Sequence, residues 1–79
     1  MVNDMVQGRY YHVRTCEDIF ILGRFEGLGE VELPSGEWVA ALGLCDVHLA
    51  GNSFTDVRCP EWTVAVRDIR GVAEADFQD

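Results

Sequence analysis

The sequence contains no lysine, and the six side chains that are cationic at pH 7 are all arginine. Fourteen aspartate and glutamate residues outnumber them, so the net charge is −8. Such a charge repels a phosphate backbone and favours basic protein surfaces. We therefore expect no direct DNA binding, and we expect a protein partner with a basic surface.

The sequence also lacks long apolar runs. No stretch approaches the run of about 18 apolar residues that a membrane span needs. The first residues have neither the basic start nor the apolar core of a signal peptide. Three cysteines are an odd set, which favours reduced thiols in the cytoplasm over a paired secreted framework. At 79 residues, we expect one small cytoplasmic domain over residues 1–79, with no membrane partner.

Motifs for catalysis and for metal binding are scarce. There is no CxxC pair, no phosphate-binding glycine loop and no nucleophile elbow. His12 and Cys16, with Cys45 and His48, are the metal-ligating residue types present. If residues 44–49 form a strand, Cys45 and His48 point to opposite faces and cannot share one ion. We predict no metal, no cofactor, no catalytic residues and no enzymatic activity.

Short apolar runs separated by glycine-rich turns indicate a β protein. Residues 9–14 predict a strand, because they are aromatic and β-branched. Residues 16–25 leave two possibilities open: one short helix capped by Thr15, or a buried strand. We favour the strand, because Gly23 interrupts a helix. Residues 26–29 predict a turn or a bulge, and residues 50–53 predict a turn. Residues 44–49 predict a strand with Cys45 on the same side as Val47 and Leu49.

The last third of the sequence predicts a second hairpin around Pro60 and Glu61. Trp62, Val64 and Val66 then share the side that faces the core, and residues 72–79 form a frayed acidic tail. The whole pattern predicts a mainly β, single-domain antiparallel fold. We expect a strongly bent sheet or open barrel of five to six strands.

The stretch GEVELPSGEWVAALGL, residues 29–44, predicts a hairpin that pairs residues 29–33 with 37–42. Pro34 suits the second position of a type I turn, and Gly36 suits the left-handed position that follows. Pairing Leu33 with Glu37 sets the valines of both strands on one face. It sets Trp38 on the other face, among glutamates.

An aromatic residue ringed by charge is typical of a contact surface for a basic partner. The candidate partner-binding residues are Phe25, Glu26, Glu30, Glu32, Glu37 and Trp38. A second possibility is that Trp38 packs under the N-terminal strand or across a bent barrel, because tryptophan is highly buried on average.

Two stretches carry a family resemblance. VELPSGEWVAALGLCDVHL, residues 31–49, resembles the first signature of the Sm-like family, and DIRGV, residues 68–72, is similar to the second. The matching positions are Val31, Leu33, Gly36, Val39, Leu44 and Asp46, then Ile69, Arg70 and Gly71. The resemblance implies a bent, five-stranded open barrel, often assembled into rings. It does not carry over RNA binding, because His48 replaces the asparagine that the family's RNA sites use.

An acidic subset of Sm-like proteins, the Rho-binding antiterminators, covers the nucleic-acid site of a helicase, and this chain resembles them in size and charge. We therefore expect an inhibitor or adaptor that covers a basic, nucleic-acid-binding surface of a partner protein. A viral or mobile-element protein acting on a host machine would have this profile. The alternatives are a self-assembling Sm-like subunit, which would be a homo-oligomer, and a small metal- or thiol-dependent protein.

Overall fold

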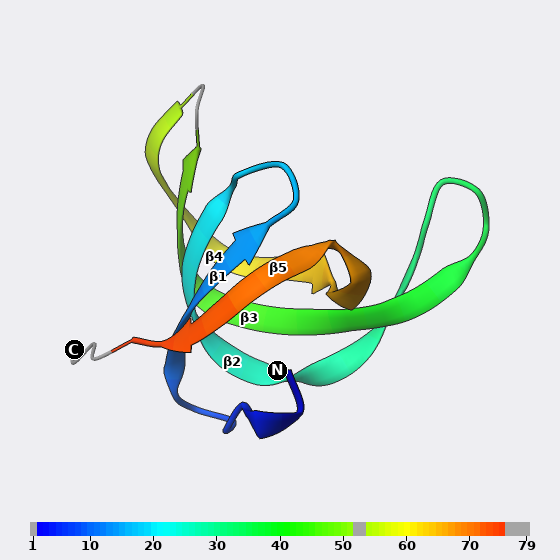
Figure 1. Cartoon of the computed structure of the whole chain (residues 1–79), viewed down its shortest axis with the longest axis horizontal. Coiled ribbons are helices and arrows are strands. Elements are labelled where there is room, and N and C mark those ends of the chain that lie inside the picture. Colours follow the sequence, from blue (N-terminus) through cyan, green and yellow to red (C-terminus); the bar gives the residue numbers. More distant parts are fainter. Residues whose placement is uncertain (1, 52–53, 76–79) are drawn as a thin grey trace.

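The computed structural model describes residues 2–51 and 54–75, which form a single five-stranded antiparallel sheet (Figure 1). The strands are β1 (Tyr10–Thr15), β2 (Phe20–Glu32), β3 (Trp38–Gly51), β4 (Phe54–Ala65) and β5 (Ile69–Glu74), with short 3-10 turns η1 (Val2–Asp4) and η2 (Val66–Asp68). Their order is β4-β3-β2-β1-β5, so β4 and β5 are the two edges of an open sheet. The predicted mainly β fold is confirmed. None of the helices in the described part of the chain is long and apolar enough to span a membrane.

The region between β1 and β2 is a turn, and no helix forms over residues 16–25. The Thr15 hydroxyl accepts hydrogen bonds from the backbone amides of Glu17 and Ile19, each at 3.3 Å. Thr15 therefore closes a tight turn, in which Asp18 adopts a positive φ of 58°. The favoured strand begins at Phe20 and pairs with β1.

Two irregularities bend the long central strands. Gly27 in β2 has a φ of 137° and Asp46 in β3 a φ of 50°, and the β2–β3 register shifts near each of them. A bulge inserts one residue and sharpens the local bend. Of the turn or bulge predicted at residues 26–29, the structure has the bulge, inside one continuous strand.

The bulge at Asp46 also changes which side chains face the core. Leu42 and Leu44 are buried before it, and Val47 and Leu49 after it, so the inward positions change from even to odd numbers. Cys45 therefore does not share the inward side with Val47 and Leu49, and that prediction was wrong. The extra residue reverses the alternation that the prediction assumed.

Strand β4 replaces the predicted second hairpin. It runs unbroken through Pro60 and Glu61, and it pairs only with β3 among the described strands. An edge strand tolerates proline because no neighbour needs its missing N–H. The core prediction for Trp62 was also wrong, since that side chain is 38% exposed, whereas Val64 on the same strand is buried. Val66 lies in η2 and is half-buried.

The core fills the concave side of the bent sheet. Its most buried side chains are Val13, Ile21, Leu42 and Val47, each at most 2% exposed. The rings of Tyr11 and Phe25 meet edge to face there, with centroids 6.4 Å apart. All five strands contribute side chains to this cluster. The two edge strands, β4 and β5, therefore share one hydrophobic core.

The C-terminal segment is more ordered than predicted up to Ala75. Strand β5 pairs with β1 from Thr15↔Ile69 to Tyr11↔Glu74, and the Ala75 amide donates to the Tyr10 carbonyl at 2.9 Å. Residues 72–74 are therefore part of the sheet and not frayed. The rest of the predicted tail, residues 76–79, and positions 52–53 of the predicted 50–53 turn lie outside the described residues.

Candidate interaction surface: an acidic hairpin arm

The β2–β3 hairpin has the predicted turn. The Gly36 amide donates to the Leu33 carbonyl at 2.8 Å, and the Leu33 amide donates to the Glu37 carbonyl at 2.8 Å. Gly36 has a φ of 91°, the left-handed conformation that glycine adopts without steric cost. Pro34 occupies the second turn position, where its restricted φ suits the type I geometry. The register Glu32↔Trp38 and Val31↔Val39 follows, as predicted.

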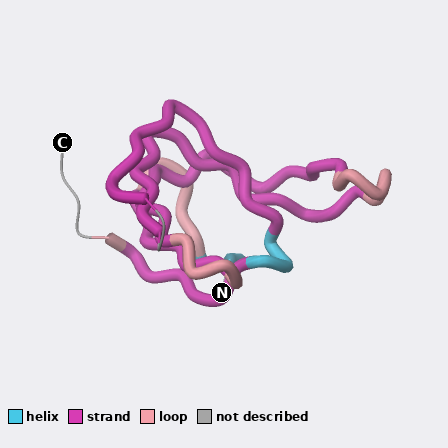
Figure 2. The backbone as a smooth tube through the Cα atoms, turned by 90° about the horizontal axis from the view of Figure 1, so that it is seen from above, coloured by secondary structure: helices cyan, strands magenta, loops and turns pink. Residues whose placement is uncertain are grey.

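We call residues 29–40 the arm, because this part of the hairpin extends beyond the rest of the sheet (Figure 1 and Figure 2). On β3, Trp38, Ala40 and Leu42 alternate on one face, which in the body of the protein is the core face. Leu42 is fully buried, whereas Trp38 is 61% exposed. The tryptophan thus lies on the core-facing side of the strand at a place where no other element covers it.

Exposed carboxylates surround Trp38. Glu32 lies directly opposite it on β2, Glu30 lies two residues further along the same face, and Glu37 precedes it. The Glu37 carboxylate is 3.5 Å from the Arg67 guanidinium, with both side chains more than half exposed. An exposed pair of this kind is worth about 0 to 1 kcal/mol, so it does not tie the arm down.

Two of the six predicted contact residues lie elsewhere. Phe25 belongs to the core at 6% exposure, so it is no part of the arm surface. Glu26 is exposed but lies beside the β2 bulge, where it contacts Arg24 and Cys45. Both residues are only a few positions before the arm in the sequence. The β2 bulge lies between them and the arm, so they belong to other parts of the sheet.

Glu26 is the centre of a small polar network on the outer side of the sheet. Its Oε1 atom accepts a hydrogen bond from the Cys45 thiol at 2.7 Å and another from Arg24 Nε at 2.8 Å. Both bonds lower the pKa of Glu26, and the bond from Cys45 has the larger effect. Burial, and then the bond to Glu26, raise the pKa of Cys45. A thiol that keeps its proton is a poor nucleophile, and here the thiol acts as a hydrogen-bond donor to Glu26.

The bulge at Asp46 has its own hydrogen bond. The Tyr10 hydroxyl donates to Asp46 Oδ2 at 2.5 Å and is the main reason that the pKa of this carboxyl lies below its usual value. The bond joins β1 to β3 across β2. It holds the bulge residue in its left-handed conformation against the sheet.

Cysteine and histidine do not cluster in the described residues. Cys16, Cys45 and Cys59 are all free thiols. Across residues 2–51 and 54–75, no group of three or more histidine, cysteine, aspartate or glutamate side chains is placed to hold a metal ion.

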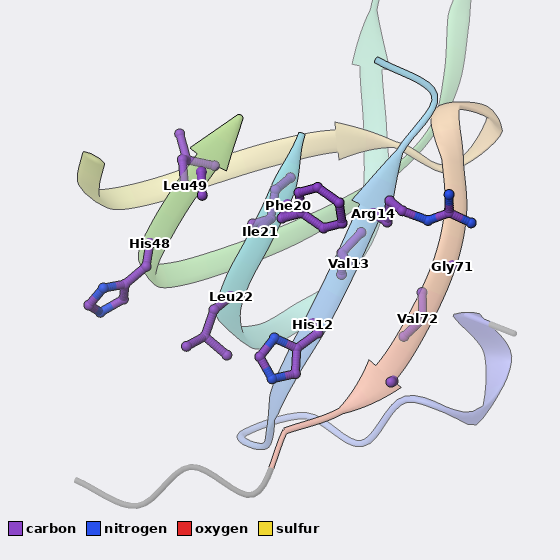
Figure 3. A pocket seen from close by; sticks show the side chains of 12 residues that line it. His12, Val13, Arg14, Phe20, Ile21, Leu22, His48, Leu49, Gly71 and Val72 are labelled. Atoms are coloured by element: carbon purple, nitrogen blue, oxygen red, sulfur yellow. The ribbon is translucent and has the colours of Figure 1, made fainter. Parts of the chain in front are cut away.

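Sequence reasoning missed a hollow of about 540 Å³ on the outer face of the sheet (Figure 3). Its central row runs across the strands as His12↔Leu22↔His48, and Arg14↔Phe20 forms the next row. These residues are distant in sequence, and only the strand register brings them together. In the sequence, the only indication of this hollow is that the residues of these two rows occupy outward positions of their strands.

No protein-family model matches this chain, and a search of curated proteins finds no match to its sequence. The Sm-like resemblance therefore stays a prediction from the two motifs.

Proposed function

We propose that this chain is a non-enzymatic interaction module whose acidic arm covers a basic, nucleic-acid-binding surface of a partner protein. The observation that carries the proposal is Trp38, which is 61% exposed on an arm that extends from the body. Tryptophan is enriched among the few residues that dominate binding energy at interfaces. A tryptophan held open to solvent on a paired hairpin is preorganised for such a contact.

The charge of the arm supports a basic partner. Glu30, Glu32 and Glu37 are all exposed, and Arg67 is the one described cation within ion-pair distance of any of them. A field of one sign raises the rate of encounter with an oppositely charged surface and disfavours nucleic acid itself. The arm would therefore compete with nucleic acid for the partner's cationic groups.

The cysteines support a location in the cytoplasm. All three are free, and Cys16 is exposed. Unpaired thiols persist in reducing compartments and tend to oxidise in secreted proteins. A cytoplasmic location would give the arm access to nucleic-acid-binding machines.

The experiment is a quantitative capture from lysate of the source cell with three baits. They are the wild-type protein, Trp38→Ala, and an arm variant in which Glu30, Glu32 and Glu37 are all changed to Gln. We expect one stoichiometric nucleic-acid-binding protein with the wild type, and at least a tenfold weaker capture with each variant, because each removes part of the contact. Nucleic acid added as competitor should release the captured protein.

A matched control removes three charges elsewhere on the surface. Asp4, Glu17 and Asp18 are exposed and lie outside the arm, so Asp4→Asn, Glu17→Gln and Asp18→Asn together change the net charge by the same amount. This control should capture the partner as well as the wild type does. Equal loss in the control and the arm variant would contradict the proposal, since it would reduce binding to net charge alone.

A self-assembling subunit is the second candidate function. Strands β4 and β5 end the strand order, so each has one side that pairs with no other described strand. Unpaired edges can join copies of a chain through backbone hydrogen bonds. Assembly of this kind would survive Trp38→Ala, because it does not use the arm.

A further inference from the structure

We propose that the hollow on the outer sheet face binds the acidic arm of a second copy of this chain, with Trp38 seated against Leu22 and Phe20. The proposal uses the same arm as the proposed function but needs no foreign partner. A copy whose arm is bound in this way would hide Trp38 from other proteins. Self-docking would therefore limit how much free arm is available.

The hollow has an apolar floor that is open to solvent. Phe20 is 52% exposed, and Leu22 lies beside it on the same face of β2. Figure 3 shows Leu22 between His12 and His48, and Phe20 beside Arg14. A volume of about 540 Å³ lies within the range of about 300 to 1,000 Å³ that is typical of binding pockets. It is ample for one indole ring.

The rim of the hollow carries an arginine, although the whole chain is strongly acidic. Arg14 lines it together with both histidines of the chain. Arg58 lies opposite His48 on β4, outside the lining, and its guanidinium is 3.9 Å from the Asp46 carboxylate. Among the described residues that line the hollow, none is acidic. Among the described residues, no carboxylate lies within ion-pair distance of Arg14. The hollow thus suits an occupant that is aromatic and negatively charged.

The arm has that chemistry. It presents one exposed tryptophan with Glu32 opposite and Glu30 and Glu37 close by. With Trp38 on the apolar floor, these carboxylates would lie near Arg14 at the rim. The structure therefore contains both halves of a matched contact, an acidic aromatic arm and an apolar hollow with Arg14 at its rim.

The two halves cannot meet within one copy. Ten residues of β2 separate Leu22 from Glu32, which is roughly 30 Å of strand at about 3.3 Å per residue. The arm points away from the body that carries the hollow (Figure 2). The contact must form between copies, and because it joins two different surfaces it either closes a ring or extends into a chain.

The strength of the contact sets the conditions of the test. One arm in one hollow is a small interface, and interfaces below about 1,200 Å² are typical of weak, transient complexes. The net charge of −8 opposes association, but at about 0.15 M salt the Debye length is about 8 Å, so distant repulsion is screened. We expect a dissociation constant in the micromolar range or weaker.

The experiment is analytical ultracentrifugation of the purified full chain from about 10 to about 500 µM, at about 0.15 M salt. The wild type should associate as its concentration rises. Trp38→Ala, which keeps the hollow, and Phe20→Glu, which keeps the arm, should each associate at least tenfold more weakly. Leu22→Glu is a second hollow variant in case Phe20→Glu unfolds. Val6→Ala removes an exposed apolar side chain away from both surfaces and should associate like the wild type.

The decisive sample is an equimolar mixture of Trp38→Ala and Phe20→Glu. One variant supplies an intact arm and the other an intact hollow, so the mixture should form a one-to-one dimer that neither variant forms alone. A monomeric wild type over the whole range would overturn the proposal, as would a mixture that stays monomeric. Association that survives both single variants would instead indicate pairing of strand edges.

Failure here is distinguishable from failure of the proposed function. The centrifugation uses the purified chain alone, whereas the partner proposal is scored by competitive capture from lysate. A monomeric protein that still captures a basic partner through Trp38 would overturn only the self-docking.

Discussion

The same pair of strands behaves differently in its two halves. In the body, the inward face of β2 and β3 carries Leu42, which is fully buried; in the arm, the same face carries Trp38, which is 61% exposed. Strand alternation is unbroken between these two positions. In the body, the other strands curve round to cover that face, while the arm extends past them. Exposure is therefore set by what packs against the face, and not by alternation along the strand.

The largest expected effect is on Leu42. Leu42→Ala should lower the free energy of unfolding by about 2 to 5 kcal/mol, because it leaves a cavity at a fully buried site. Trp38→Ala, four residues away on the same face, should change it by about 0.5 kcal/mol or less. Urea denaturation of both variants measures the difference. If Trp38→Ala were the more destabilising variant, Trp38 would have to be packed against another part of the protein, and its exposed position would be wrong.

Glycines of β2 give the next comparison. A Cβ atom on Gly23 would lie 3.1 Å from Leu44 Cβ and from Val47 Cγ2, whereas a Cβ atom on Gly29 would have no heavy atom within 4 Å. Gly23→Ala should therefore destabilise the protein by about 1 to 3 kcal/mol through overpacking. Gly29→Ala should be neutral or stabilise it by up to about 1 kcal/mol, because the unfolded chain loses freedom.

Thermal unfolding of these two variants provides the check. Equal losses would mean that the arm is as tightly constrained as the body. A neutral Gly23→Ala would show that β3 can move away from β2 at the Asp46 bulge.

The smallest effect concerns pH and the Asp46 bulge. The pKa of Asp46 is lowered from its ordinary value of 3.8 mainly by the Tyr10 hydrogen bond. A lowered folded pKa contributes stability that is present above the unfolded pKa and is lost as the pH falls through the folded pKa. Tyr10→Phe should raise the pKa of Asp46 toward 3.8. The variant should then lose less of its unfolding free energy than the wild type does when the pH falls below 3.8.

An NMR titration of the Asp46 carboxyl carbon measures that pKa directly. Asp46→Asn is the control for the unfolding curves, because asparagine tolerates the left-handed backbone and does not titrate. An unchanged Asp46 pKa in Tyr10→Phe would show that the charges of His48 and Arg58 hold it low instead.

Local features were the predictable part of the fold. The turn at Pro34 and Gly36, the register of Trp38 and the strand at Phe20 all follow from interactions within a few residues, and the structure has each of them. The errors at Cys45 and Trp62 have a different origin. A single inserted residue at Asp46 reverses the alternation in β3. Trp62 lies opposite the buried Leu44, but it is on an edge strand and remains 38% exposed.

The candidate sites divide in the same way. Four of the six predicted contact residues lie on or in the arm, because a hairpin brings close neighbours in sequence together. The other two do not: Glu26 lies beside the β2 bulge, where it bonds to Arg24, and Phe25 is buried in the core. The hollow could not be predicted, because its residues come from three strands and meet only through the register His12↔Leu22↔His48.

The sequence by itself determined the acidic character of the chain, its β composition and the hairpin that carries Trp38, since these depend on residue type and on contacts between near neighbours. Only the tertiary structure decided that Trp38 is exposed, that Trp62 is not core, and that an apolar hollow with Arg14 at its rim lies on the outer face. Those outcomes depend on which strands cover which face and on where two bulges bend the sheet, and both are consequences of long-range packing.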